Sequence, residues 1–195
     1  MEVREQEWAG AQAFAALLAG SGALRPGHTI LQGGLHSGGW IEKGAIIRDP
    51  LRLDEVARVQ AEQIGRVWPQ ATLLVGLPEC GAVLSAFVAR HLGLPVAFVH
   101  SSGVPGWHRM HVPERAERAV IVDDLIGTGR GVRVAADFLI REGHAVLGVS
   151  AWISRAEPGA LKVLTLMPPP YPTWKAEGCP DCSAGYAPRY TGIRE

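Results

Sequence analysis

Residues 119–131 read Ala-Val-Ile-Val-Asp-Asp-Leu-Ile-Gly-Thr-Gly-Arg-Gly, and this stretch decides the fold of the chain. The β-branched run at 120–122 predicts a buried parallel strand. Asp123 and Asp124 follow at its carboxyl end, the edge at which open α/β sheets bind their ligands. Alternating glycines then lead into residues 132–141, whose apolar positions have helical spacing. Backbone N–H groups converge in such a loop at a helix N-terminus, so the stretch predicts a strand, an acid pair, an anion-binding loop and a helix.

The acid pair separates this loop from two other phosphate-binding loops. A P-loop needs a lysine within the loop, and a dinucleotide-binding fingerprint needs no paired acids before its glycines. Two carboxylates beside a phosphate-binding loop suit a ribose 5′-phosphate, because they can accept hydrogen bonds from the 2′- and 3′-hydroxyls. The alternative is a glycine-rich turn with a solvated acid pair and no ligand.

Composition indicates one domain with a substantial apolar core. The chain has 195 residues, of which 47% are hydrophobic and 19% are charged, and its formal net charge is zero. Zero net charge argues against general binding to nucleic acid or to an anionic membrane. No apolar run is long enough to span a bilayer, and the N-terminus does not read as a signal peptide, so we expect a cytoplasmic protein. Three cysteines do not suggest a secreted disulfide scaffold.

Strand and helix patterns alternate through the middle of the chain. Besides the central unit, we expect strands at 72–75, 95–99 and 146–153, a helix at 51–67, and a second helix that follows the loop 76–82 and ends at about residue 91. This alternation predicts right-handed βαβ units and a parallel sheet.

The two ends of the chain differ from this α/β core. We expect a short helix at 8–19 and two edge strands joined by a glycine-rich turn within 31–43, which we call the hood segment. A last edge strand is expected at 161–166. Four prolines follow it and predict an irregular tail. The chain is thus one domain, with an N-terminal part at about 1–48, a core at about 49–166 and a tail at about 167–195.

Two further loops are candidates for ligand contacts. Residues 76–82 also join a strand to a helix, so their backbone can hold a second anion. The alternative for Glu79 is a first-turn acid favoured by the helix dipole, and for Cys80 a small buried residue is the better interpretation. Residues 100–118 are long, polar and without periodicity, which is typical of a functional lid or of disorder. The lid contains no lysine, and the candidate cations of its first part are His100, His108, Arg109 and His111.

The central stretch resembles the phosphoribosyl-diphosphate (PRPP) motif of the type I phosphoribosyltransferases. That motif is an apolar strand, two acids, two residues, Thr-Thr-Gly, one residue, and Thr or Ser; here glycines stand at 127 and 131 in place of hydroxyl residues. The resemblance implies the type I phosphoribosyltransferase fold, an α/β fold with a central parallel sheet flanked by helices and a small N-terminal hood. It also implies catalytic roles for the two aspartates and PRPP contacts from Asp123, Asp124, Leu125, Ile126, Gly127, Thr128, Gly129, Arg130 and Gly131. The implied pyrophosphate loop is Leu77, Pro78, Glu79, Cys80 and Gly81.

The hood segment resembles the N-terminal signature of orotate phosphoribosyltransferases, through Leu31, Gly34, Ser37, Trp40 and Glu42. The implied reaction joins orotate to PRPP, giving orotidine 5′-phosphate and pyrophosphate for pyrimidine biosynthesis. The implied base contacts are Arg155, which would pair with the orotate carboxylate, together with Trp40, Lys43 and Gly127.

The family resemblance further implies a Mg²⁺ ion carried by PRPP rather than by protein ligands, and a homodimer. The lid departs from the family pattern, because the family's lid carries lysines that close over pyrophosphate. Two alternatives therefore stay open: a phosphoribosyltransferase for another base, and a non-catalytic PRPP- or nucleotide-sensing protein of the same fold.

A Cys-x-x-C motif lies in the tail. Cys179 and Cys182 are separated by Pro180 and Asp181, and the chain contains no second cysteine pair to complete a zinc knuckle. A similar Cys-Pro-x-Cys tail occurs in one bacterial branch of the resembled family. We therefore interpret the motif chiefly as a family feature and rank a bound zinc below that interpretation.

Overall fold

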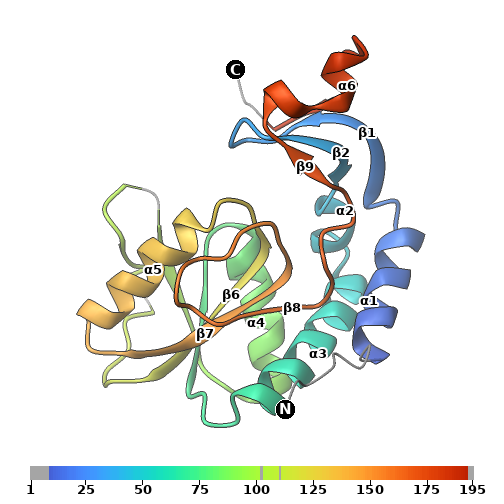
Figure 1. Ribbon diagram of the computed structural model, residues 1–195. Coiled ribbons are helices and arrows are strands. Elements are labelled where there is room, and N and C mark those ends of the chain that lie inside the picture. Colours follow the sequence, from blue (N-terminus) through green and yellow to red (C-terminus); the bar gives the residue numbers. More distant parts are fainter. Residues whose placement is uncertain (1–8, 102, 110, 193–195) are drawn as a thin grey trace, which may run out of the picture.

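The computed structural model describes residues 9–101, 103–109 and 111–192 (Figure 1). Its larger sheet consists of β3 (Leu73–Gly76), β4 (Val96–His100), β5 (Gly106–Trp107), β6 (Arg118–Ile126), β7 (Ala145–Ser154) and β8 (Val163–Thr165). The strand order is β5-β4-β3-β6-β7-β8, and all neighbours are parallel except β5, which runs antiparallel to β4. The predicted parallel sheet is confirmed, and the predicted central strand lies between β3 and β7.

Helices cover both faces of this sheet (Figure 1). Val120 and Val122 of β6 pack into a cluster with α3 (Pro50–Val67) and α4 (Cys80–Leu92). Ile121 points to the other face, where it packs with α5 (Arg130–Arg141). Because successive residues of a strand face opposite sides, one run of β-branched residues joins both layers of the core.

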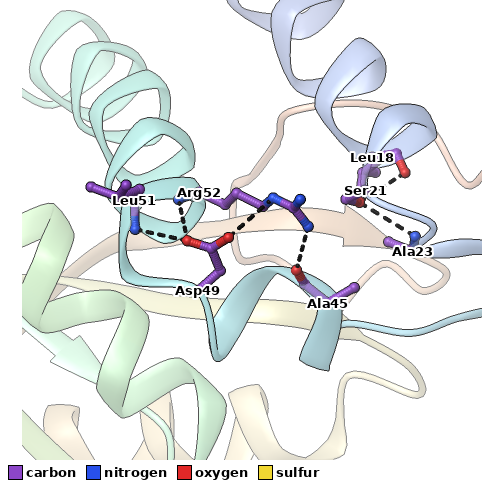
Figure 2. A network of polar contacts seen from close by, with 7 residues as sticks. All are labelled: Leu18, Ser21, Ala23, Ala45, Asp49, Leu51 and Arg52. Atoms are coloured by element: carbon purple, nitrogen blue, oxygen red, sulfur yellow. Dashed lines mark hydrogen bonds and ion pairs between the residues drawn. The ribbon is translucent and has the colours of Figure 1, made fainter.

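The start of α3 shows how local chemistry sets a helix boundary. Asp49 caps the helix: its Oδ1 accepts hydrogen bonds from the backbone N–H groups of Leu51, at 3.1 Å, and Arg52, at 3.3 Å (Figure 2). Pro50 occupies the first helical position, where its missing N–H costs nothing. Arg52 also donates to the carbonyl of Ala45 in α2 (Gly44–Ile47), at 3.3 Å, and so ties the helix to the segment that leads in from the hood.

A smaller sheet forms the hood. It contains β1 (Leu24–Ile30), β2 (His36–Ile41), β9 (Thr173–Trp174) and β10 (Tyr190–Thr191), in the order β10-β1-β2-β9. We call this four-stranded unit the hood sheet. The strand expected at the end of the hood segment is present as β2, but it is an inner strand and not an edge strand. Its partner β1 lies wholly before residue 31, so the expectation of two edge strands within 31–43 was wrong. Pro26 and Gly27 lie within β1, and both residue types are rare in strands, which is why the pattern missed it.

The tail is not irregular, and this corrects the expectation for residues 167–195. It supplies both outer strands of the hood sheet, and between them it forms a 3₁₀ turn (Ala176–Gly178) and α6 (Pro180–Ser183). Figure 1 shows this red segment beside the blue β1, although the two lie at opposite ends of the sequence. The prolines do keep residues 168–172 out of regular structure, but short strands beyond them pair with distant partners.

The remaining predicted elements agree with the structure within a few residues. The first helix is α1 (Ala9–Gly20), and Trp8, the start of the predicted helix, lies outside the described residues. The expected last edge strand is β8. Within the described ranges, no helix is both long enough and apolar enough to cross a bilayer.

Candidate active site

A cavity of about 990 Å³ lies where the carboxyl ends of β3, β6 and β7 meet the hood sheet. Its wall on the side of the larger sheet consists of the pyrophosphate loop and the end of β6 with the loop that follows. The hood contributes the opposite wall. The lining residues are Leu31, Gln32, Gly33, Leu35, Trp40, Ile41, Lys43, Leu77, Pro78, Glu79, Cys80, Gly81, Asp123, Asp124, Leu125, Gly127, Thr128, Arg155, Thr191 and Gly192.

The two aspartates lie at the floor of the cavity but in different surroundings. Asp123 Oδ1 accepts a hydrogen bond from the Asp124 backbone N–H at 2.9 Å, and Asp124 Oδ1 accepts one from the Leu125 backbone N–H at 2.8 Å. The Asp124 side chain is buried, and its Oδ2 lies 2.8 Å from Lys43 Nζ. Lys43 therefore neutralises one carboxylate of the pair.

Burial and charge set the protonation of these groups. Burial, reinforced by the negative charge of Asp124, raises the pKa of Asp123 well above its ordinary value. Burial by itself would lower the pKa of Lys43, but attraction to Asp124 outweighs it, so that pKa is raised and the ammonium ion is stabilised. Burial and the charge of Asp124 also raise the pKa of the Cys80 thiol, so Cys80 is poorly suited to act as a nucleophile.

The predicted anion-binding loop joins β6 to α5 at the cavity. Leu125, Gly127 and Thr128 line the cavity, whereas Ile126, Gly129, Arg130 and Gly131 do not. Gly129 caps α5 with a φ of 72°, a left-handed conformation that favours glycine. The loop thus leads directly into the N-terminus of α5, whose unpaired N–H groups attract an anion.

The loop predicted to hold pyrophosphate lines the cavity over its whole length, from Leu77 to Gly81. It leads into α4, so a second helix N-terminus faces the same space. Gly81 lies so close to β6 that a Cβ atom there would be 2.9 Å from both Asp123 Oδ1 and the Val122 carbonyl oxygen. A side chain at this position would push the helix away from the acid pair.

The predicted base contacts Trp40, Lys43 and Arg155 all line the cavity. Burial lowers the pKa of Arg155 from its ordinary value, and its Nε is buried without a hydrogen-bond partner among the described residues. Trp40 Nε1 donates to Glu42 Oε2 at 3.4 Å, which holds the indole at the hood wall. A buried guanidinium nitrogen without a partner at a cavity wall is suited to an anionic ligand.

Two parts of the wall were not predicted. The first part belongs to the hood segment and consists of Gln32, Leu35 and Ile41. The sequence predicted that this segment contacts the ligand but did not single out these three residues. Thr191 and Gly192 come from the tail and carried no sequence signal. Gly192 N–H donates to the Ile30 carbonyl at 2.8 Å, so the pairing of the tail with β1 carries these two residues to the cavity.

The predicted lid residues lie elsewhere. In the described part of the lid, which leaves out residues 102 and 110, none of His100, His108, Arg109 and His111 lines the cavity. Trp107 anchors the segment by packing on Phe138 and His144, and β5 pairs it with the sheet edge at β4. A catalytic role for these cations stays a prediction.

The tail cysteines do not line this cavity. Cys182 lies in α6, which Figure 1 shows at the end of the hood away from the larger sheet. Sequence reasoning looked for a second cysteine pair and missed two histidines, because these are distant in the sequence. His28 and His36 lie beside Cys179 and Cys182.

Comparison with known proteins gives a consistent picture. A model of the phosphoribosyl transferase domain family matches residues 43–163. The chain is 33% identical over 181 residues to an orotate phosphoribosyltransferase of Methylorubrum extorquens, covering 89% of this chain and 91% of the relative.

Solved structures share the fold. The orotate phosphoribosyltransferase of Aeropyrum pernix superimposes with a TM-score of 0.69 at 20% identity, over 80% of this chain and 93% of that one. Adenine phosphoribosyltransferase of Saccharomyces cerevisiae superimposes with a TM-score of 0.60 at 17% identity, over 80% of this chain and 99% of that one. At these identities, the structural likeness speaks for the fold and not for the base.

Proposed function

The chain belongs to the phosphoribosyl transferase domain family, and from this premise we propose that it transfers the phosphoribosyl group of PRPP to orotate. The observation that carries the proposal is the cavity itself. Its wall combines an acid pair, two loops at helix N-termini, and a half-buried arginine, Arg155, beneath the hood. The relatives' activity supports the same assignment.

PRPP fits the floor of the cavity by its chemistry. We assign its 5′-phosphate to the loop 127–131 at the N-terminus of α5, and its pyrophosphate group to the loop 77–81 at the N-terminus of α4. The ribose hydroxyls would then donate to Asp123 and Asp124, which line the same cavity as the two loops.

Orotate fits the opposite wall. Its carboxylate would supply the partner that the buried Nε of Arg155 lacks among the described residues, and a bidentate pair with the guanidinium suits a planar substrate. Trp40 would cover the ring. Lys43 is already paired with Asp124, which places its charge on the ribose side, so its assignment as a base contact stays a prediction.

The chemistry is a displacement at C1 of the ribose. The bond from C1 to the pyrophosphate oxygen breaks and its electron pair leaves with pyrophosphate, while N1 of orotate loses its proton to solvent and bonds to C1, which gives orotidine 5′-phosphate and pyrophosphate. Positive charge develops on the ribose in the transition state, and negative carboxylate charge beneath it is stabilising. When no substrate is present, the ammonium group of Lys43 offsets the negative charge of Asp124.

Mg²⁺ suits this cavity as a substrate-borne ion. The cavity wall offers hard carboxylate oxygens from Glu79, Asp123 and Asp124, but Asp124 is already paired with a lysine. This donor set fits a hydrated ion held by pyrophosphate, with the carboxylates accepting hydrogen bonds from its waters. When bound, Mg²⁺ would offset negative charge on the departing pyrophosphate.

One observation favours a second candidate function. The lid cations lie away from the cavity in the described residues, so charge on the leaving group has no lid partner within this subunit. A protein that binds PRPP without turning it over would tolerate this arrangement. In a homodimer, the partner's lid could supply the missing cations to this cavity, and the protein would then be catalytic.

Pyrophosphate release tests both candidates. The full chain is assayed with PRPP, Mg²⁺ and, in turn, orotate, uracil, adenine and hypoxanthine. We expect release with orotate above all other bases. Preference for another base overturns the orotate assignment. If calorimetry detects PRPP binding but no base supports pyrophosphate release, the protein is the non-catalytic sensor instead.

A further inference from the structure

The structure brings together two histidines and two cysteines that lie at opposite ends of the chain. The group comprises His28 on β1, His36 on β2, and Cys179 and Cys182 at either end of the first turn of α6. Each offers one ligand atom, and all four atoms lie within 4.8 Å of one another. We propose that this Cys₂His₂ group is a structural zinc site that fastens the C-terminal tail to the hood sheet.

The spacing of the ligand atoms is that of a tetrahedral metal site. Cys182 Sγ lies 3.3 Å from His36 Nδ1 and 3.5 Å from His28 Nε2, and Cys179 Sγ lies 3.6 Å from His28 Nε2. A tetrahedron with a zinc–sulfur distance of about 2.3 Å and a zinc–nitrogen distance of about 2.0 Å separates sulfur from nitrogen by about 3.5 Å. The two ring nitrogens are 3.0 Å apart, close to the roughly 3.3 Å of the same tetrahedron.

The outer contacts of His28 fit a metal ligand. Its Nδ1 lies 2.8 Å from the backbone carbonyl oxygen of Tyr186 and can only donate to that acceptor. A neutral imidazole that donates through Nδ1 leaves its Nε2 lone pair free, and Nε2 is the atom that faces the other three ligands. Metal-binding histidines characteristically donate their second nitrogen in this way.

The backbone aims the ligands at one point. The pairing of β1 with β2 shifts register between Pro26 and Thr29, and Gly27 has a φ of 132° within this irregularity. Such bulges redirect side chains, here that of His28. On the tail, the short α6 begins directly after Cys179 and carries Cys182 back toward the same side. His28, His36 and Cys179 are buried, so these side chains are not grouped merely because they face solvent.

The donor set selects the metal. Two thiolates and two imidazoles in tetrahedral arrangement are typical of zinc, whereas magnesium prefers oxygen ligands. All four positions are supplied by protein, which is the pattern of a closed structural site and not of a catalytic one. The cysteines are free thiols, so the metal has no disulfide to compete with.

The consequence concerns the hood. Within the described residues, the strand pairing of the tail with β1 is short, at Tyr190 and Thr191, and that with β2 is equally short, at Thr173 and Trp174. Short strands of this kind give little stability alone. A metal that joins β1, β2 and α6 would supply folding energy to the hood sheet. Because Thr191 and Gly192 line the cavity, the metal would also hold one wall of the site in place.

Metal content tests the proposal directly. The full chain, produced in zinc-supplemented medium and dialysed, should carry about one zinc per chain by elemental analysis. The double variant Cys179→Ser/Cys182→Ser and the variant His28→Ala should lose that zinc. Cys80→Ser and His91→Ala are matched controls that remove a cysteine and a histidine outside the group, and both should keep it. Wild-type protein without zinc, or a double variant that keeps it, overturns the proposal.

Two measurements on wild-type protein remain decisive if the variants fail to fold. A mercurial thiol reagent should release zinc, detected with a coloured chelator, in step with modification of two thiols. Protein in which cobalt replaces zinc should show the intense visible bands of tetrahedral, thiolate-bound cobalt. Weak bands of octahedral cobalt, or zinc that stays bound after all thiols have reacted, contradict the assignment. None of these readouts depends on which base the enzyme uses.

Discussion

Adjacent residues of β6 carry the same side chain and meet different electrostatic surroundings. Asp124 is buried against Lys43, whereas burial and the charge of Asp124 raise the pKa of Asp123. The folded protein therefore keeps a proton on Asp123 in a pH range where the unfolded chain has released it. The associated stability is fully present below the unfolded pKa of about 4 and is lost as the pH rises through the folded pKa.

Replacing Asp123 should remove this pH dependence. We expect the free energy of unfolding of Asp123→Asn to fall less steeply than that of wild type above about pH 4, by about 1.4 kcal/mol for each pH unit between the unfolded and folded pKa. Urea denaturation across pH measures it, with the exposed Asp137→Asn as control. Parallel stability profiles of wild type and Asp123→Asn would contradict the raised pKa. The variant should also lose turnover.

Arg155 is the residue on which the choice of base depends. Losing a charge-assisted bidentate contact in a site shielded from water costs about 2–5 kcal/mol. Arg155→Ala should therefore lower kcat/KM for orotate by at least about thirtyfold, while PRPP affinity stays near that of wild type. Any use of uracil, which lacks the carboxylate, should change little.

Steady-state kinetics with both bases and calorimetry with PRPP check this prediction. The control is Arg58→Ala, which removes an exposed arginine that pairs with Glu62 on α3. Orotate turnover that survives Arg155→Ala would place the carboxylate elsewhere.

At the scale of elements, the approach of α4 to β6 holds the pyrophosphate loop beside the acid pair. Gly81→Ala would place its Cβ 2.9 Å from Asp123 Oδ1 and from the Val122 carbonyl oxygen. We expect the variant to lose about 1–3 kcal/mol of stability, as is usual for overpacking, and to bind PRPP more weakly.

Gly106→Ala serves as a control that separates the effect of the clash at Gly81 from the general effect of replacing a glycine. At Gly106 an added Cβ has no atom within 4 Å, so Gly106→Ala shares the entropy gain of replacing glycine without the clash. Urea denaturation of both variants measures the difference. If Gly81→Ala is as stable as Gly106→Ala, the close approach of α4 is not what positions the loop.

At the scale of the whole molecule, the separation of the lid cations from the cavity bears on how subunits assemble. We expect a homodimer in which one subunit's lid serves its partner's cavity. Light scattering at micromolar concentration should give the mass of two chains, and the mass of one chain would contradict the expectation.

Mixed dimers test whether the lid acts across the interface. The inactive parents are Asp124→Asn, which lacks an acid, and His108→Ala/Arg109→Ala, which lacks lid cations. After random mixing, about one quarter of wild-type activity should return, because half of the dimers are hybrid and each hybrid contains one intact site. Activity no higher than that of the parents would confine the lid to its own subunit.

Local pattern was sufficient for the centre of this protein. The β-branched run at 120–122, the acid pair and the alternating glycines lie within one short segment, and each part needs only its neighbours to form strand, loop and helix. The parallel sheet follows from the same alternation along the chain, because right-handed connections leave few arrangements. The loops 77–81 and 127–128 and Arg155 could be placed at one site because each follows a parallel strand and these strands end at one edge. Trp40, on β2 of the hood sheet, could be placed there only through the resemblance of the hood segment to a known family.

What required the tertiary structure is contact between residues far apart in the sequence. Cys179 and His28 are 151 residues apart, and no local pattern records that their side chains meet. The same holds for the pairing of Lys43 with Asp124 and for the tail strands that complete the hood sheet. The sequence by itself determined the elements of the α/β core and the chemistry of the acid pair, since these depend on residues a few positions apart. Only the packing of the whole chain decided which lysine neutralises that pair, which tail residues wall the cavity, and that two histidines stand beside the cysteines.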